Sequence, residues 1–178
     1  MHPVSSRLKM GFSKGMGIFM CNDRRYKEWR FYPKFLKFIQ SLNLQYFSAE
    51  ELLILGHSHY IVGHKAYQQN SYPPNYLWSN IVTPILVLDI LRARVGHSIK
   101  ITSAYRSDRY NHLIGGKKQS YHLGFNALDF SCDGVAMQEL SEMLLHIRDK
   151  EMIFKGGVGR YSSFIHLDCR GQNANWSS

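Results

Sequence analysis

Cysteine is scarce in this chain, with three residues in 178. Cys21, Cys132 and Cys169 cannot all pair within one chain, and a disulfide framework in so short a domain would need more of them. The sequence therefore predicts free, buried thiols and synthesis in a reducing compartment.

Long apolar runs are also lacking. No uninterrupted run approaches the roughly 20 apolar residues that cross a bilayer as a helix, so membrane insertion is not expected. The weakly apolar stretch 10–20 follows Arg7 and Lys9, but Lys14 interrupts it and no clean small-residue cleavage site follows. We therefore expect no signal peptide and a cytoplasmic pool of the protein.

Acidic residues are outnumbered, because 13 Asp and Glu oppose 22 Lys and Arg and leave a net charge of +9. Such a surface attracts polyanions by long-range steering, and nucleic acid, anionic membrane and bacterial wall polymers all qualify. No aromatic-interleaved basic stripe or known reader motif accompanies the charge, so specific nucleic-acid binding is not expected. With 44% hydrophobic residues, the length suits one buried core and a monomer.

Hydrophobic spacing predicts an α+β domain with a small, mostly antiparallel sheet and flanking helices. Apolar periodicity and helix-start signals predict helices over 33–42, 48–55, 77–95, 108–113 and 136–148. Alternation predicts strands over 99–103, 126–132, 157–161 and 163–169, the last two forming a hairpin around Ser162.

Two segments carry no sustained period. Residues 1–30 are predicted to form a loosely ordered arm that docks through Phe19, Trp29 and Phe31, with a single domain over 31–178. The polar segment 56–75, broken by two prolines, is predicted to be a long surface connection.

Two imidazoles and one carboxylate stand on two distant turn-and-strand segments, at His122, Asp129 and His166. Zinc takes nitrogen and oxygen ligands tetrahedrally, and a catalytic site keeps its fourth position for water. Gly124 is expected to let the backbone bend between the first two residues. From the residues alone, the alternative is that His122 lies in a surface loop and that His166 is a core histidine with its hydrogen bonds satisfied.

The surrounding sequence strengthens the zinc reading. It runs from Ile101-Thr102-Ser103-Ala104-Tyr105-Arg106-Ser107 through Asn111, Gly115-Gly116, Ser120, His122, Gly124, Ala127 and Asp129 to Gly156-Gly157-Val158-Gly159, Tyr161, Phe164, His166, Asp168 and Arg170. This pattern, over about residues 99–176, resembles the zinc D-Ala-D-Ala carboxypeptidase family, which includes phage endolysin peptidases and the hedgehog signalling domain. The resemblance implies the α+β fold of the hedgehog and D-Ala-D-Ala peptidase domains, with one zinc ion held by His122, Asp129 and His166.

The resemblance also implies roles for neighbouring residues. Arg106 matches a family arginine that clamps a substrate carboxylate or oxyanion, although a surface salt bridge is the alternative. Ser120 either donates to substrate, orients His122 or caps the turn. Many members carry a His two positions before the last ligand, or a Glu three before it, as general base.

This chain has Phe164 and Ser163 at those positions, so its general base is open. Asp168 is the candidate because strand alternation places it on the same face as His166. Orienting His166 or binding Arg170 are its alternative roles.

Other candidate residues receive a structural interpretation. His57, His59 and His64 lie in a polar connection without a carboxylate or cysteine at suitable spacing, so they are predicted to be surface histidines. Cys132 and Cys169 are expected on the strand face opposite to the ligands. Lys117 and Lys118 are either solvated or in contact with an anionic substrate.

The expected function is that of a zinc-dependent peptidase acting on bacterial peptidoglycan peptides, as a D,D-carboxypeptidase or an endolysin-type endopeptidase. Basic charge and the expected cytoplasmic pool favour a phage or prophage lysis enzyme. The alternative is a non-catalytic, zinc-stabilised wall-binding or virion-associated module, which the open base position motivates.

Overall fold

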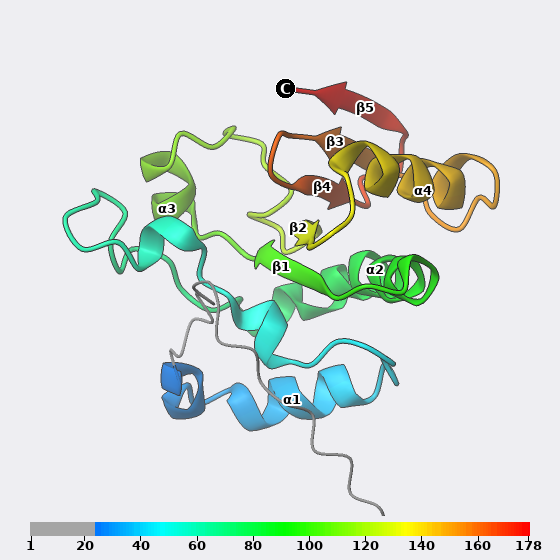
Figure 1. Ribbon diagram of the computed structural model, residues 1–178. Coiled ribbons are helices and arrows are strands. Elements are labelled where there is room, and N and C mark those ends of the chain that lie inside the picture. Colours follow the sequence, from blue (N-terminus) through cyan, green and yellow to red (C-terminus); the bar gives the residue numbers. More distant parts are fainter. Residues whose placement is uncertain (1–23) are drawn as a thin grey trace, which may run out of the picture.

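The structure is a computed structural model that describes residues 24–178; Phe19 and Cys21 lie outside the described residues. A five-stranded sheet has the order β1-β2-β4-β3-β5 (Figure 1). Its strands are β1 Ile99–Ser103, β2 Ala127–Cys132, β3 Gly157–Arg160, β4 Ile165–Asp168 and β5 Ala174–Ser177. The α-helices are α1 Tyr32–Gln40, α2 Val82–Val95, α3 Asp108–Leu113 and α4 Met137–Asp149. Short 3₁₀ helices are η1 Arg24–Glu28, η2 Glu50–Leu53, η3 His57–His59 and η4 Asn75–Ile81.

The sheet confirms the predicted α+β class. Neighbouring strands pair antiparallel from β1 to β3, and β5 alone pairs parallel, with β3. The predicted bounds of β1 and α3 agree with the structure, whereas β5 was not predicted. Its sequence, Ala-Asn-Trp-Ser, is short and polar, so it lacks the β-branched alternation that identifies a strand.

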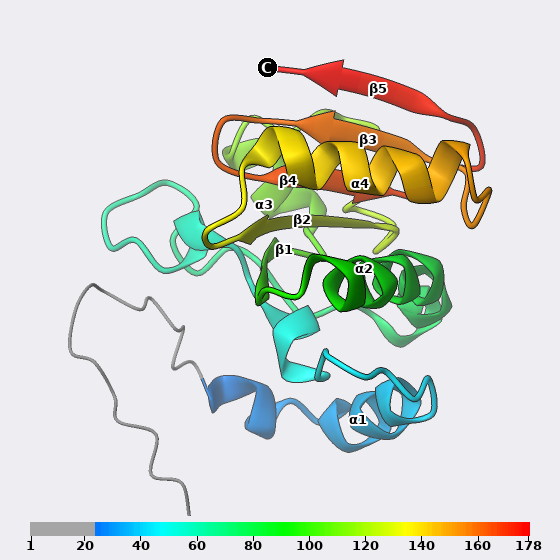
Figure 2. The same cartoon turned by 45° about the vertical axis from the view of Figure 1, so that its right-hand side comes forward.

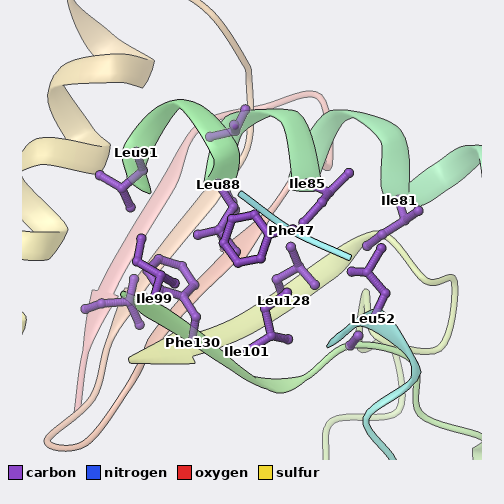
Figure 3. Packing of buried hydrophobic residues seen from close by; sticks show 14 of the residues in the cluster. Phe47, Leu52, Ile81, Ile85, Leu88, Leu91, Ile99, Ile101, Leu128 and Phe130 are labelled. Carbon is purple, nitrogen blue, oxygen red and sulfur yellow. The ribbon is translucent and has the colours of Figure 1, made fainter. Parts of the chain in front are cut away.

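One face of the sheet carries the hydrophobic core. Helices α2 and α4 lie side by side over this face (Figures 1 and 2). Figure 3 shows Ile85 and Leu88 of α2 above Leu128 of β2, and all three are fully buried. Each such side chain contributes about 1.5–3 kcal/mol through the removal of apolar surface from water. Cys132 is buried within this cluster and Cys169 packs against it, and both are free thiols.

The central helix is longer than α2 alone, because η4 leads directly into it. Residues Asn75–Val95 form a helical segment that is long and apolar enough to cross a membrane by length and composition. The core helix of a soluble protein passes the same test, and this one packs Ile85, Leu88 and Leu91 into the core. The prediction of no membrane insertion is not tested by this finding.

The N-terminal elements reach the turn that precedes β2 through aromatic rings. Trp29 packs against Phe35 of α1, with ring centroids 5.8 Å apart. Phe35 in turn contacts Phe125, at 6.3 Å between centroids. Docking through Trp29 agrees with the sequence analysis, and the boundary expected between residues 30 and 31 stays a prediction.

The connection over 56–75 differs from the predicted surface segment. His59 is only 3% exposed, and Asn70 is buried as well. The Asn70 amide donates to the carbonyls of Leu55 and Tyr105 and accepts from the Ser107 N–H, at 2.8–3.0 Å. The prediction of surface histidines is therefore wrong for His59. The buried Asn70 amide, with its polar atoms satisfied, fixes this connection against the segment between β1 and α3.

Candidate metal centre

A single row of residues crosses all five strands on the face opposite the core helices. Asp129 of β2 pairs with Ser103 of β1 on one side and with His166 of β4 on the other. Gly159 of β3 pairs with both His166 and Trp176 of β5. Directly paired residues point to the same face of a sheet. The register therefore brings Asp129 and His166 together although 36 residues lie between them in the sequence.

His122 completes a triangle with these two residues. Its Nε2 lies 3.1 Å from Asp129 Oδ1 and 3.2 Å from His166 Nδ1, and the remaining edge, from His166 Nδ1 to Asp129 Oδ1, is 2.8 Å. Two ligands of a tetrahedral zinc lie roughly 3.3 Å apart, because each is about 2.0–2.1 Å from the ion. The two nitrogens and one oxygen therefore fit a zinc ion in both donor type and spacing, as a three-residue metal group.

Each histidine has a hydrogen-bond acceptor at its nitrogen outside the triangle. His122 Nδ1 donates to the carbonyl of Ala104 at 2.6 Å, and His166 Nε2 donates to Asp168 Oδ2 at 3.0 Å. Such outer hydrogen bonds fix the tautomer and ring orientation of metal-binding histidines. Burial lowers the pKa of His122, which favours its neutral, ligating form. Burial disfavours the charged form of His166, but Asp129 and Asp168 raise its pKa above the ordinary value.

Asp168 lies behind His166 and is fully buried. Its Oδ1 accepts from the Gly157 N–H and from Arg170 Nε, and its Oδ2 accepts from Arg170 Nη2 and His166. Burial alone would raise the pKa of Asp168, but Arg170 and His166 bring it well below its usual range. These contacts are those of a carboxylate that orients His166. Both Asp168 oxygens are occupied, so neither is free to take a proton from the attacking water.

The turn that carries His122 is shaped by backbone hydrogen bonds. The His122 carbonyl accepts from the N–H groups of Arg106 and Phe125, at 3.1 and 3.2 Å. The positive φ of this turn, 54°, falls at Phe125 and not at Gly124, so the predicted reason for the glycine is wrong. Buried contacts of the Phe125 ring with α1 and with Tyr105 hold that backbone in place.

Arg106 lies beside the triangle and is mostly buried. Its Nε donates to Ser103 Oγ at 2.9 Å, and its Nη2 pairs with Asp129 Oδ2. Burial raises the pKa of Asp129, but His122, His166 and Arg106 together lower it well below its ordinary value. Asp129 is therefore ionised, with one oxygen toward the histidines and the other toward Arg106.

An open cavity of about 290 Å³ adjoins Asp129 and Arg106. Its walls include Asp129, Arg106, Tyr110, His57, Ser163 and Phe164. This volume is near the lower limit of the ~300–1,000 Å³ typical of small-ligand sites. Ser120, the other residue implied for substrate binding, does not line the cavity. The Ser120 backbone closes a turn, with its N–H bound to Lys117 and its carbonyl to Leu123, both at 3.1 Å.

The sequence interpretation missed the aromatic side of the centre. The ring of Trp176 lies 5.4 Å from that of His166, and its Nε1 donates to the hydroxyl of Tyr161 at 3.0 Å. A Cβ on Gly159 would come within 2.4 Å of the Trp176 ring, so only glycine lets the indole lie this close. Arg170 stacks over the same ring at 5.3 Å. Alternating glycines at 157 and 159 were the available signal, because they mark a close approach.

Comparisons with known proteins agree with this arrangement. The sequence profile of the family described as Peptidase M15 matches residues 46–168. The chain is 36% identical over 77 residues to the peptidoglycan L,D-endopeptidase MepK of Escherichia coli K12, and equally to those of Escherichia coli O157:H7 and Shigella flexneri. The chain spans 39% of the length of these curated relatives, over 39% of its own. No solved structure matches it significantly.

Proposed function

Because this chain belongs to the Peptidase M15 family, we propose that it is a zinc-dependent peptidase that hydrolyses peptide bonds in peptidoglycan stem peptides or their cross-links. The observation that carries the proposal is the triangle of His122, Asp129 and His166, whose edges of 2.8–3.2 Å suit one tetrahedral ion. The outer hydrogen bonds that orient both histidines support the same ion.

Zinc at this position would lower the pKa of a water to about 7 and polarise an amide carbonyl. The residues of the chain contribute the remaining tasks. Asp129 and the two histidines hold the ion, while the Ala104 carbonyl and Asp168 keep the imidazoles oriented.

Arg106 supplies positive charge to the cavity beside the ion. Two of its nitrogens are engaged by Ser103 and Asp129, and its remaining N–H groups are available to a substrate carboxylate or to the oxyanion that forms during attack. Stem peptides carry carboxylates, which a chain with a net charge of +9 also attracts at long range.

The relatives favour one of the two reactions expected from the sequence. They are named L,D-endopeptidases of peptidoglycan, which supports the endopeptidase over the carboxypeptidase. A cavity open to solvent supports it as well, because an endopeptidase accommodates substrate on both sides of the bond. The cytoplasmic pool and the role in phage lysis stay predictions from the sequence.

Mass spectrometry of muropeptides after incubation with the zinc-loaded protein tests the proposal. An endopeptidase is expected to release peptide fragments larger than one amino acid. Release of a terminal D-Ala alone would indicate a carboxypeptidase. The His166→Ala variant is expected to give no products. Equal fragment patterns for the two proteins would contradict the peptidase and would favour the non-catalytic wall-binding module, provided that both proteins are folded.

A further inference from the structure

The cavity beside the metal centre needs a group that moves protons during amide hydrolysis. Water gives up a proton when it attacks, and the leaving nitrogen takes one up. Asp168 is fully buried and bound on both oxygens, as described above. The residues at the positions where many resembling peptidases carry their base, Ser163 and Phe164, line the cavity but do not titrate near neutral pH.

Four titratable side chains line this cavity: Asp129, Arg106, Tyr110 and His57. Asp129 belongs to the metal triangle, and the Arg106 guanidinium has only N–H donors and no atom that accepts a proton. Burial raises the pKa of Tyr110, so its hydroxyl keeps its proton at neutral pH. Imidazole is the side chain that both accepts and donates a proton between pH 5 and 8. By chemistry, His57 is the lining residue suited to both transfers.

The fold holds His57 at this wall through its two neighbours. Gly56 has a φ of 83°, and a Cβ there would lie 2.5 Å from the Tyr110 hydroxyl, so the chain presses directly against α3. Two residues further on, His59 is buried, and its Nδ1 accepts from the Asn70 N–H at 3.1 Å. Between these fixed points, the exposed residue His57 lines the cavity from the side of η3.

We propose that His57 is a catalytic residue that shuttles the proton in this reaction. The inference rests on the proposed peptidase function. As water attacks, the new carbon–oxygen bond forms and the water proton passes to the His57 imidazole. As the carbon–nitrogen bond breaks, the imidazolium returns that proton to the leaving amine. The products are a carboxylic acid and an amine, and His57 ends neutral, so atoms and protons balance.

The closing experiment compares wild type with His57→Gln, using soluble muropeptides from muramidase-digested peptidoglycan as the probe. We expect kcat to fall by about 10²–10⁴, the usual contribution of a positioned acid or base, with little change in KM. The shape of the pH profile of kcat should also change. Zinc affinity, measured by competition with a chromophoric chelator, should be unchanged.

The matched control is His112→Gln, which removes an exposed histidine of α3 that does not line the cavity. It should retain wild-type rate and pH profile. As a second test, added imidazole should restore part of the activity of His57→Ala.

A His57→Gln rate within threefold of wild type would overturn the inference and leave the peptidase function standing. Loss of zinc affinity in that variant would overturn it too, since it would give His57 a structural role. If the zinc-loaded wild type itself cleaves nothing, the proposed function fails and the role of His57 with it.

Discussion

Neighbouring residues along each strand of the central sheet face opposite sides of it. One side packs into the hydrophobic core, and the other carries the candidate metal centre. Leu128, Leu167 and Val158 pair across three strands on the core face. The residues next to them in the sequence, Asp129, His166 and Gly159, pair across the same three strands on the other face. Side chains alternate along a strand, so the same backbone ladder supports both rows.

The comparison shows how a small domain combines stability with reactivity. The core row is apolar and buried under α2 and α4, and it removes surface from water. The site row places the Asp129 carboxylate and the His166 imidazole 2.8 Å apart, and with His122 these residues form a group of metal-binding type. Substitutions on the core row should therefore alter folding, and substitutions on the site row should alter metal binding.

His122→Ala should give the largest effect on the site side. It removes one corner of the triangle, so zinc affinity should fall by more than the roughly 10–100-fold that follows from losing an outer hydrogen-bond partner. Peptidase activity should fall to the level of a blank. Chelator competition and muropeptide analysis measure the two losses, with His97→Ala, an exposed histidine after α2, as control. A variant that still binds zinc as tightly as wild type would contradict the assignment of the ligand.

Leu128→Ala tests the other face. A fully buried leucine replaced by alanine leaves a cavity and should lower the free energy of unfolding by about 2–5 kcal/mol. The folded fraction should still bind zinc with near wild-type affinity. Urea unfolding of the apo protein measures the first effect. Leu86→Ala, at a position of α2 that is 39% exposed, should change stability by less than about 0.5 kcal/mol. If Leu128→Ala instead weakened zinc binding and left stability intact, the division between the faces would not hold.

Local sequence patterns predicted much of this division. Alternating apolar residues identified β1 and β2, and helical spacing identified α2 and α4, because burial of one face imposes those periods. The residues of the metal triangle came from the same patterns together with a family resemblance. Strand alternation also predicted that Asp168 lies on the same face as His166, and in the structure these two side chains are in contact.

What the sequence did not predict depends on contacts between distant segments. Trp176 lies on a polar edge strand whose partner is set by the parallel pairing with β3, which no local pattern encodes. His57 stands in a segment read as surface, and its place at the cavity follows from the burial of His59 and Asn70 nearby. Binding of Arg170 was among the roles considered for Asp168, but the Gly157 N–H that also donates to this carboxylate comes from the neighbouring strand β3 and was not predicted.

Gly159→Ala tests whether the close approach of the Trp176 ring to β3 requires a glycine. The added methyl group would overlap the Trp176 indole, so β5 must shift, and overpacking of this kind costs about 1–3 kcal/mol. Zinc affinity should fall as well, because the indole supports His166. The matched control is Gly124→Ala, whose Cβ would meet only the Tyr121 carbonyl at 3.7 Å and should be tolerated. Thermal unfolding with and without zinc measures both, and equal behaviour of the two variants would refute a steric requirement at Gly159.

Asp168→Asn should give the smallest of these effects and sharpens the comparison most. The amide keeps the size of the carboxylate but loses its charge, so the hydrogen bond that fixes the His166 tautomer weakens. Zinc affinity should fall by about 10–100-fold, as for other outer partners of metal-binding histidines. Asp133→Asn, at an exposed position after β2, is the control and should bind zinc like wild type.

The pH profile of the remaining activity separates the two roles considered for Asp168. If it orients His166, the zinc-saturated Asp168→Asn variant should recover most of the wild-type rate, and the profile should keep its shape. If it is the general base, saturation with zinc should not help, and the rate should stay lower by about 10²–10⁴. The first outcome fits a carboxylate with both oxygens bound inside the protein, whereas the second would move proton transfer from the cavity wall to the sheet itself.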